Sequence, residues 1–176
     1  MLTPPVSSRD HQMGPADAPV VLVEYGDYEC PYCGEAYPIV QALQRAVQDS
    51  LLLVFRNFPL AQAHPHAEAA AMAAESAAAQ GKFWEMHDTL FEHQDALDDD
   101  SLAQYANALG LDINQFAKDM RDRRHQNHIR EDFRGGVRSG VNGTPTFFIN
   151  GARYDGPRDL RSMRAAIESA ARPHRK

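Results

Sequence analysis

Long hydrophobic runs are absent from this sequence. No stretch among its 176 residues approaches the ~18–20 consecutive apolar residues that a transmembrane helix requires. The opening segment, MLTPPVSSRDHQMG, also lacks the apolar core of a signal peptide. We therefore expect no membrane segment, and the lack of a visible secretion signal favours a cytoplasmic location.

Cysteine is scarce, with two residues in the whole chain. Two cysteines cannot build the disulfide framework of a small secreted domain, and these two lie too close together in the sequence for a long-range covalent link. Both points agree with a reducing compartment.

Positive charge is also limited, because 18 Lys and Arg residues stand against 24 Asp and Glu residues, which gives a formal net charge of −6. An acidic surface repels phosphate, so a general nucleic-acid binder or anionic-membrane binder is disfavoured. The remaining composition, 43% hydrophobic and 24% charged, is close to the ~45–50% and ~25% of globular proteins. The length fits one domain, since domains typically have roughly 100–200 residues.

The first part of the chain predicts a strand–helix–strand unit. Residues 1–18 are polar and predict an extended arm. A β-branched run at 20–25 predicts a buried strand, and apolar residues at helical spacing predict a helix over 31–48. A second buried strand is expected at 51–55, which completes a βαβ unit.

The middle of the chain is helical and the last part returns to strands. Strands at 146–149 and 152–154 are joined by Asn150-Gly151, a strong hairpin signal, and a helix follows over 157–171. Before them, helices are predicted at 67–79, 82–93, 101–109 and 112–133, with Gly135-Gly136 interrupting the helical pattern.

The segment Cys30-Pro31-Tyr32-Cys33 carries the most informative pattern. It follows a buried strand and opens a helix, where Pro31 suits the first turn. The unpaired N–H groups and the dipole of a helix N-terminus favour an anion, and the first sulfur is expected to point out over that terminus as a thiolate. Cys33 lies one turn further on, within reach to resolve a mixed disulfide. The pattern therefore predicts thiol–disulfide exchange.

A zinc site is the main alternative for the two cysteines. Zinc takes four ligands in a structural site, and the chain has no second Cys pair. Histidines would have to complete the set, yet none follows the cysteines at zinc-finger spacing. We therefore expect no metal site, although candidate histidines exist at positions His64, His66, His87, His93, His125 and His128.

A second pattern, Gly143-Thr144-Pro145-Thr146, stands directly before the strand at 146–149. Proline cannot donate to the hydrogen-bond ladder of a sheet, so its position needs a special geometry. A cis bond between Thr144 and Pro145 would make a sharp turn and leave backbone groups free to pair with an extended peptide. Taken alone, the pattern favours a trans proline at the start of a strand, because only about 5–6% of X–Pro bonds are cis.

The segments VEYGDYECPYCGEAYP and GVNGTPTFFING, with the helical block between them, resemble the DsbA-type proteins of the thioredoxin fold, in a form without a signal sequence. The resemblance spans residues 10–171. It implies an α/β fold with a thioredoxin-like core, ordered β-α-β then β-β-α around a central mixed sheet. The core would occupy 19–60 and 136–172, the inserted helical subdomain 61–135, and the N-terminal arm 1–18.

The same resemblance implies roles for single residues. Cys30 would be the nucleophile and Cys33 the resolving thiol. Pro145 would be a cis proline that faces the cysteines, and Thr144 would touch both Cys30 and the substrate chain. Substrate contacts are expected from Pro31, Tyr32, Thr144 and Pro145.

Glu24 is a further candidate, because thioredoxin-like proteins often keep a buried acid six residues before the first cysteine. A carboxyl group among Val23, Tyr25 and the core would have a raised pKa. It could then relay a proton to or from Cys33. The alternative is a glutamate at a strand edge that faces solvent.

The dipeptide between the cysteines departs from the periplasmic oxidants that this sequence resembles, which carry a histidine there. Tyr32 cannot hold a positive charge, and Asp27 and Glu29 should add negative potential that disfavours a thiolate. The Pro-Tyr pair looks like that of glutaredoxins, whose potentials lie at roughly −200 to −230 mV. We therefore expect a protein less oxidising than DsbA, whose potential is about −120 mV.

These observations favour an enzyme, a thiol–disulfide oxidoreductase that exchanges disulfides with cysteine-containing proteins or small thiols. No cofactor is expected beyond the redox-active cysteines, with glutathione as a conceivable co-substrate and a redox partner left unidentified. No nucleic-acid partner and no membrane are expected. The substrate, the direction of electron flow and the oligomeric state are not indicated by the sequence.

Three alternatives stay open at this point. A glutathione-dependent transferase or isomerase of the kappa type shares the core and the insertion, although those proteins generally use a serine and lack the second cysteine. A binding module could use its dithiol only to sense redox state. A zinc-binding structural module is the third alternative.

Overall fold

The computed structural model describes residues 1–172 and contains a five-stranded mixed sheet in the order β1-β3-β2-β4-β5. β2 and β3 run parallel, and every other neighbouring pair is antiparallel. The strands are β1 (His11–Met13), β2 (Val20–Gly26), β3 (Leu51–Asn57), β4 (Thr146–Ile149) and β5 (Ala152–Tyr154). The α/β class and the mixed sheet predicted from the sequence are confirmed.

The central strand β2 supplies side chains to two cores, because successive residues of a strand point to opposite faces. Val20 and Leu22 pack with α1 (Pro31–Ala46) and α7 (Leu160–Ala170) on one face. Val23 and Tyr25 pack on the other face with Phe148 and the N-terminal arm. β2 is therefore buried on both sides, as its β-branched run predicts.

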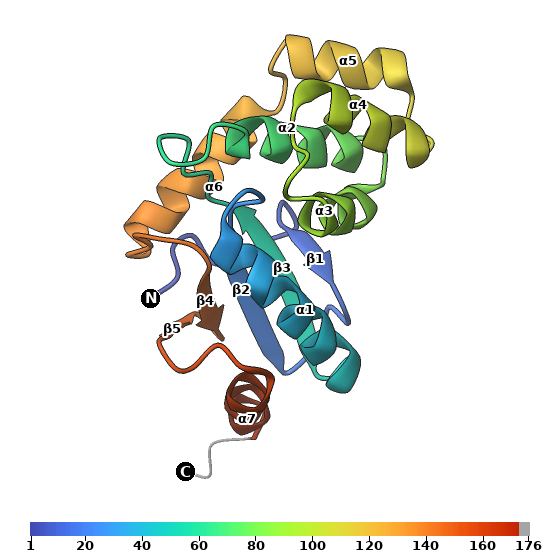
Figure 1. Ribbon diagram of the computed structural model, residues 1–176. Helices are drawn as coiled ribbons and strands as arrows, with labels where there is room; N and C mark the ends of the chain where they lie inside the picture. Colours follow the sequence, from blue (N-terminus) through green and yellow to red (C-terminus); the bar gives the residue numbers. More distant parts are fainter. Residues whose placement is uncertain (173–176) are drawn as a thin grey trace.

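Five helices form a block that covers one end of the sheet (Figure 1). They are α2 (Ala67–Ala78), α3 (Phe83–Glu92), α4 (Asp99–Ala108), α5 (Ile113–Arg121) and α6 (Gln126–Arg138). Alanines of α2 and aromatic residues such as Phe83, Phe91 and Phe116 fill the core of this block. These aromatic residues are buried, and they pack with both cysteines and with Phe55 of β3.

Two parts of the chain differ from the sequence prediction. The helix expected over 112–133 is two helices, because the chain turns between α5 and α6 with Arg123 at a positive φ of 51°. The arm also contributes β1, an edge strand that pairs with β3. A three-residue polar strand carries too little periodicity to be recognised from sequence.

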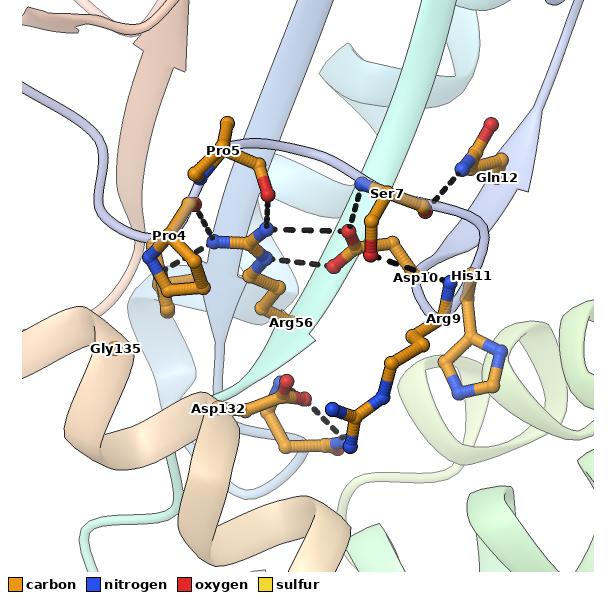
Figure 2. A network of polar contacts seen from close by, with 12 residues as sticks. Pro4, Pro5, Ser7, Arg9, Asp10, His11, Gln12, Arg56, Asp132 and Gly135 are labelled. Carbon is orange, nitrogen blue, oxygen red and sulfur yellow. Dashed lines mark hydrogen bonds and ion pairs between the residues drawn. The ribbon is translucent and has the colours of Figure 1, made fainter.

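A buried arginine holds this arm in place. The guanidinium of Arg56 on β3 pairs with the carboxylate of Asp10 at 2.7 Å and donates to the carbonyl oxygens of Pro4 and Pro5 (Figure 2). Both side chains are nearly inaccessible to solvent, so the charge of Arg56 is neutralised where burial would otherwise penalise it. The arm is thus part of the folded core.

Gly135 and Gly136, expected to interrupt the helical pattern, lie inside α6 instead. Their role is steric. A Cβ atom at Gly136 would stand 2.7 Å from the ring of Phe58 and 3.1 Å from that of Tyr25, closer than carbon atoms pack. Glycine therefore lets α6 approach the sheet. No helix within residues 1–172 has the length and hydropathy needed to cross a bilayer.

Gly136→Ala should lower the free energy of unfolding by about 1–2 kcal/mol, since overpacking costs about 1–3 kcal/mol and the better helix propensity of alanine returns up to about 1 kcal/mol. Urea denaturation followed by circular dichroism measures this change. Val137→Ala, at an exposed position of the same helix, is the control and should stay within about 0.5 kcal/mol of the parent. Equal stability of the two variants would contradict the close-approach role.

Candidate active site

The two cysteines meet at the start of α1. Cys30 is the N-cap residue, Pro31 follows in the first turn, and the backbone N–H of Cys33 donates to the carbonyl oxygen of Cys30 at 3.1 Å. No disulfide joins the two cysteines. Cys33 is fully buried, whereas Cys30 keeps 3% of its surface exposed, so the nucleophile is more covered than the sequence analysis expects.

The two thiols differ sharply in acidity. A hydrogen bond from Cys33 lowers the pKa of Cys30 to about 5, against the effect of burial, and the backbone N–H groups of Cys33 and Tyr32 also lower it. Burial raises the pKa of Cys33 far above that of an ordinary thiol, and its hydrogen bond to Cys30 and the nearby charge of Glu24 act in the same direction. Cys30 is therefore a thiolate at neutral pH and Cys33 is its proton-bearing neighbour.

The loop before β4 lies against the nucleophile. The peptide bond between Thr144 and Pro145 is cis, and Sγ of Cys30 lies 3.4 Å from the carbonyl oxygen of Thr144. The hydroxyl Oγ1 of Thr144 is buried and has no hydrogen-bond partner in the described part of the chain. The site thus brings Cys30, Thr144 and Pro145 together from parts of the chain more than 100 residues apart.

An open groove of about 430 Å³ begins at this loop. Tyr32, the most exposed residue of the dipeptide, lies on one side, and Arg153, Tyr154 and Arg158 line the other. Arg158 donates to the carbonyl oxygen of Pro145 at 3.4 Å. An extended chain beside Cys30 would pass through this polar groove, so Arg153 and Arg158 join the substrate-contact candidates that the sequence analysis missed. Arg153 lies in the second strand of the hairpin and Arg158 follows it, and neither position carries a recognisable motif.

Glu24 lies in the middle of β2 on the face that α1 covers, with 3% of its surface exposed. The alternative of a solvent-facing edge glutamate is therefore wrong. Burial raises its pKa to about 8, and its Oε1 atom has no hydrogen-bond partner within residues 1–172. It also lines a cavity of about 180 Å³ together with Gln41, Trp84 and His87. This cavity connects the carboxyl group to the surface beside α1 and α3.

The two acids expected to oppose the thiolate are each paired with a histidine. The Asp27 carboxylate contacts Nδ1 of His64 at 2.7 Å, and that of Glu29 contacts Nδ1 of His66 at 2.8 Å. Burial alone would lower the pKa of His64, but its hydrogen bond to Asp27 raises the pKa above the usual value. The negative potential predicted from the sequence is thus partly offset by these histidines. The sequence analysis missed this effect because it considered them only as metal ligands.

A glutamine from the helical insertion supports the turn at the cysteines. Nε2 of Gln94 donates to the carbonyl oxygens of Tyr28 and Cys30, at 2.8 and 2.9 Å. A Cβ atom at Gly34 would stand 2.0 Å from the end of the Gln94 side chain, so a larger residue there would displace this side chain. Contacts between segments 60 residues apart leave no pattern in a single sequence, and neither residue was predicted.

Within residues 1–172, the cysteines do not share a metal-binding cluster with the histidines. Among the described residues, one group of metal-ligating side chains converges, and it consists of His11, Glu75 and His128. Of the histidines considered as partners for the cysteines, His87 instead contacts the hydroxyl of Tyr28 at 3.0 Å, and burial lowers its pKa to about 3.

Cys33→Ala should raise the pKa of Cys30 from about 5 by about 1–2 units, because the lost hydrogen bond to a charged group contributes about 1.5–3 kcal/mol and one pKa unit corresponds to about 1.4 kcal/mol. The rate of Cys30 alkylation by iodoacetamide, followed against pH, reports this value. Tyr32→Phe retains the backbone donor and should leave the profile unchanged. An unaltered profile in Cys33→Ala would show that the neighbouring thiol is not the main cause.

Glu24→Gln should change the pH dependence of stability. The pKa of Glu24 is about 8 in the folded state, against 4.5 for a glutamate in water, so the folded protein binds the extra proton between these values and stability falls as pH rises from about 4.5 to about 8. The variant lacks this decline. Its free energy of unfolding, relative to that of the parent, should therefore rise by at most about 5 kcal/mol between acidic and alkaline pH.

Urea denaturation of both reduced proteins measures this difference, and the contribution of Cys30 cancels because both contain it. Glu35→Gln, at an exposed position of α1, serves as the control and should follow the parent at every pH. Parallel curves for Glu24→Gln and the parent would mean that the Glu24 carboxyl group is not shifted by burial.

Comparison with known proteins identifies the family of this chain. A family model described as "Thioredoxin" matches residues 7–169. Curated relatives include the Na(+)/H(+) antiporter NhaA 3 of Salinispora tropica, 47% identical over 170 residues, which are 97% of this chain and 26% of that protein. The Na(+)/H(+) antiporter NhaA 1 of Salinispora arenicola is 46% identical over 170 residues, which are 97% of this chain and 26% of that protein. The chain spans about a quarter of the length of the curated relatives it matches.

Solved structures agree in fold. A thioredoxin-like oxidoreductase from Silicibacter pomeroyi superimposes with a TM-score of 0.83 at 29% identity, over 93% of each chain. BdbD from Bacillus subtilis gives 0.85 at 23% identity over 95% of each chain. The thiol-disulfide exchange protein α-DsbA2 from Wolbachia pipientis gives 0.82 at 20% identity, over 93% of this chain and 88% of that one. The chain belongs to the thioredoxin family, with the fold of its DsbA-type members.

Proposed function

We propose that this chain is a thiol–disulfide oxidoreductase that acts through Cys30 and Cys33 on cysteine-containing proteins or small thiols. The carrying observation is the division of acidity between the two thiols: the pKa of Cys30 is lowered to about 5 while that of Cys33 is strongly raised. The Cys30 sulfur is thereby available as a nucleophile, while the Cys33 sulfur keeps its proton until the second step. Two of its structural relatives are named as an oxidoreductase and as a thiol-disulfide exchange protein, which supports the same activity.

The reaction with a substrate disulfide takes two exchanges. The Cys30 thiolate attacks one substrate sulfur, which forms a mixed disulfide and releases the other substrate sulfur as a thiolate. Cys33 then loses its proton and attacks the Cys30 sulfur, which releases the second substrate thiolate and leaves a Cys30–Cys33 disulfide. Two electrons pass from the protein to the substrate. The reverse sequence oxidises a substrate dithiol.

Glu24 serves as the proton carrier for Cys33. With a pKa of about 8, it is mostly protonated at neutral pH and can change state within the physiological range. In the oxidising direction it donates a proton to the departing Cys33 sulfur, whose thiolate is disfavoured in this buried site. In the reducing direction its carboxylate accepts the Cys33 proton, and the adjoining cavity gives that proton a route to solvent.

Thr144 and Pro145 position the substrate. Their loop borders both Cys30 and the groove lined by Arg153 and Arg158, so an extended peptide there would bring its own sulfur to the nucleophile. Tyr32 and Pro31 contribute from the dipeptide. The reaction needs no metal or organic cofactor, and glutathione is a candidate small thiol. The cytoplasmic location and the kappa-type alternative stay predictions from the sequence.

A redox-sensing module is the second candidate, and one observation favours it. The chain matches about a quarter of proteins that are named Na(+)/H(+) antiporters, so the same fold occurs there beside a much longer segment. In such a setting the dithiol could report redox state to the attached part. Cys30→Ser separates the two candidates, because an enzyme loses turnover of a disulfide substrate such as insulin, whereas a sensing module keeps its partner and has no turnover to lose.

The midpoint potential of the Cys30–Cys33 pair should lie nearer to roughly −200 mV than to the −120 mV of DsbA, because Tyr32 adds no positive charge within the dipeptide. Equilibration in glutathione buffers, acid quenching and mass labelling of free thiols measure it. Cys33→Ser, which can form but not resolve a mixed disulfide, is the control. A midpoint near about −120 mV would contradict the role given to Tyr32, and no reversible transition at all would contradict the enzyme.

A further inference from the structure

A second cluster of chemically active side chains lies away from the cysteines. His11 from β1, Glu75 from α2 and His128 from α6 direct their ligand atoms together, all within 4.8 Å of one another. Asp132, one turn after His128 on α6, adds a carboxylate whose Oδ2 atom stands 3.8 Å from Nε2 of His128. We propose that His11, Glu75 and His128 bind a divalent transition-metal ion of the Zn²⁺ class, with Asp132 beside the fourth coordination position.

The distances fit such an ion. Zn²⁺ binds imidazole nitrogen and carboxylate oxygen at about 2.0–2.2 Å, so the ligand atoms of a tetrahedral site lie about 3.3–3.5 Å apart. Nε2 of His11 is 2.9 Å from Oε1 of Glu75, and Nε2 of His128 is 3.8 Å from the same oxygen. These two distances bracket the spacing of a tetrahedral site, and all three ligand atoms lie within 4.8 Å of one another.

The charges of the cluster favour a cation. Glu75 keeps 5% of its side chain exposed and Asp132 keeps 11%, so two carboxylates lie close together with little water around them. Such groups need positive partners. A divalent ion would balance both carboxylates, and imidazole binds such an ion in its neutral form.

Surrounding residues hold the ligands in place. The ring of His11 stacks on Phe83 with a centroid distance of 3.6 Å and an angle of 7°. Nδ2 of Asn57 donates to Oε1 of Glu75 at 2.7 Å and to Oδ2 of Asp132 at 3.2 Å, which fixes both carboxylates. Hydrogen-bonded partners of this kind orient metal ligands in established sites.

An ion also has a way in. A surface cavity of about 230 Å³ is lined by His128 and Asp132 on one side and by Ser7, Asp10 and Arg56 on the other. Figure 2 shows Asp132 on α6 and His11 on the arm; Asp132 lines this cavity, whereas His11 lies outside its lining. The ligand atoms are thus buried enough to be preorganised and remain reachable from solvent.

The donor set selects the class of metal. Two imidazole nitrogens with carboxylate oxygens suit Zn²⁺ and neighbouring transition metals, whereas Ca²⁺ and Mg²⁺ prefer sites made of oxygen alone. The sequence analysis expects no metal because it considers ligand sets that include the cysteines. His11 and Glu75 lie 64 residues apart and are brought together by the pairing of β1 with β3, so no spacing motif marks them.

Binding would be measured in the Cys30→Ser/Cys33→Ser protein, which removes the thiols as competing ligands and makes the result independent of the proposed oxidoreductase activity. Isothermal titration with Zn²⁺ after dialysis against chelator should show one saturable ion per chain. Titration with Co²⁺ should give the visible absorption of a nitrogen- and oxygen-ligated tetrahedral ion. Zn²⁺ should also raise the Tm, because an ion that binds only the folded state stabilises it.

Variants locate the site. His128→Ala should weaken Zn²⁺ binding by at least the roughly 10–100-fold that loss of an outer-shell partner costs in established sites. His125→Ala is the matched control, since His125 begins the same helix and contacts Asp119 instead, and it should bind as the parent does. Asp132→Asn, nearly equal in size, provides a second test should His128→Ala lose its circular dichroism spectrum.

Each possible result either supports or overturns the metal site. One ion per chain, weakened by His128→Ala and unaffected by His125→Ala, supports the site. The absence of saturable binding overturns it. Equal binding by His128→Ala and the parent, or equal weakening by His125→Ala, places the ion elsewhere and overturns it too. Tighter binding of Ca²⁺ than of Zn²⁺ would overturn the transition-metal class.

Discussion

The hydrogen bond between the two thiols is the interaction on which the chemistry of this protein depends. A lone buried thiol would be a weak acid, because burial disfavours the thiolate. Here the Cys33 thiol donates a hydrogen bond to Cys30. This bond lowers the pKa of Cys30 and raises the pKa of Cys33. In the mechanism that we propose, the order of attack follows from this asymmetry: the sulfur at the helix terminus reacts first, and the sulfur one turn inside reacts once a mixed disulfide has removed the negative charge beside it.

The position of that pair follows from the burial of β2. Because both faces of this strand are covered, its end is held at the centre of the sheet, and α1 must begin there. β4 is the antiparallel neighbour of β2, so the turn that precedes β4 ends beside the same helix terminus. Thr144 and Pro145 thus reach Cys30 through strand pairing. Glu24 reaches the site through the alternation of side chains along β2.

Much of this could be predicted from the sequence, because the signals are local. A β-branched strand, a proline at a helix start, two cysteines one turn apart and a hairpin after Thr144-Pro145 each fix a short piece of structure. What could not be predicted depends on distant contacts. The pairing of His64 with Asp27, the support of Cys30 by Gln94 and the glycines of α6 that admit Phe58 all join segments whose neighbourhood exists only after folding.

The electrostatic balance at Cys30 shows why residue identity alone is an incomplete guide. A histidine between the cysteines would place a full positive charge next to the thiolate. This chain places a histidine, His64, on the far side of Asp27, and the two form an ion pair at 2.7 Å. A close pair of opposite charges acts at a distance as a dipole, whose effect falls off faster than that of a single charge. His64 therefore offsets part of the repulsion from Asp27 without adding the strong attraction of an unpaired imidazolium. The thiolate is then stabilised mainly by hydrogen bonds at the helix terminus, which are short-ranged and less sensitive to salt than a surface charge.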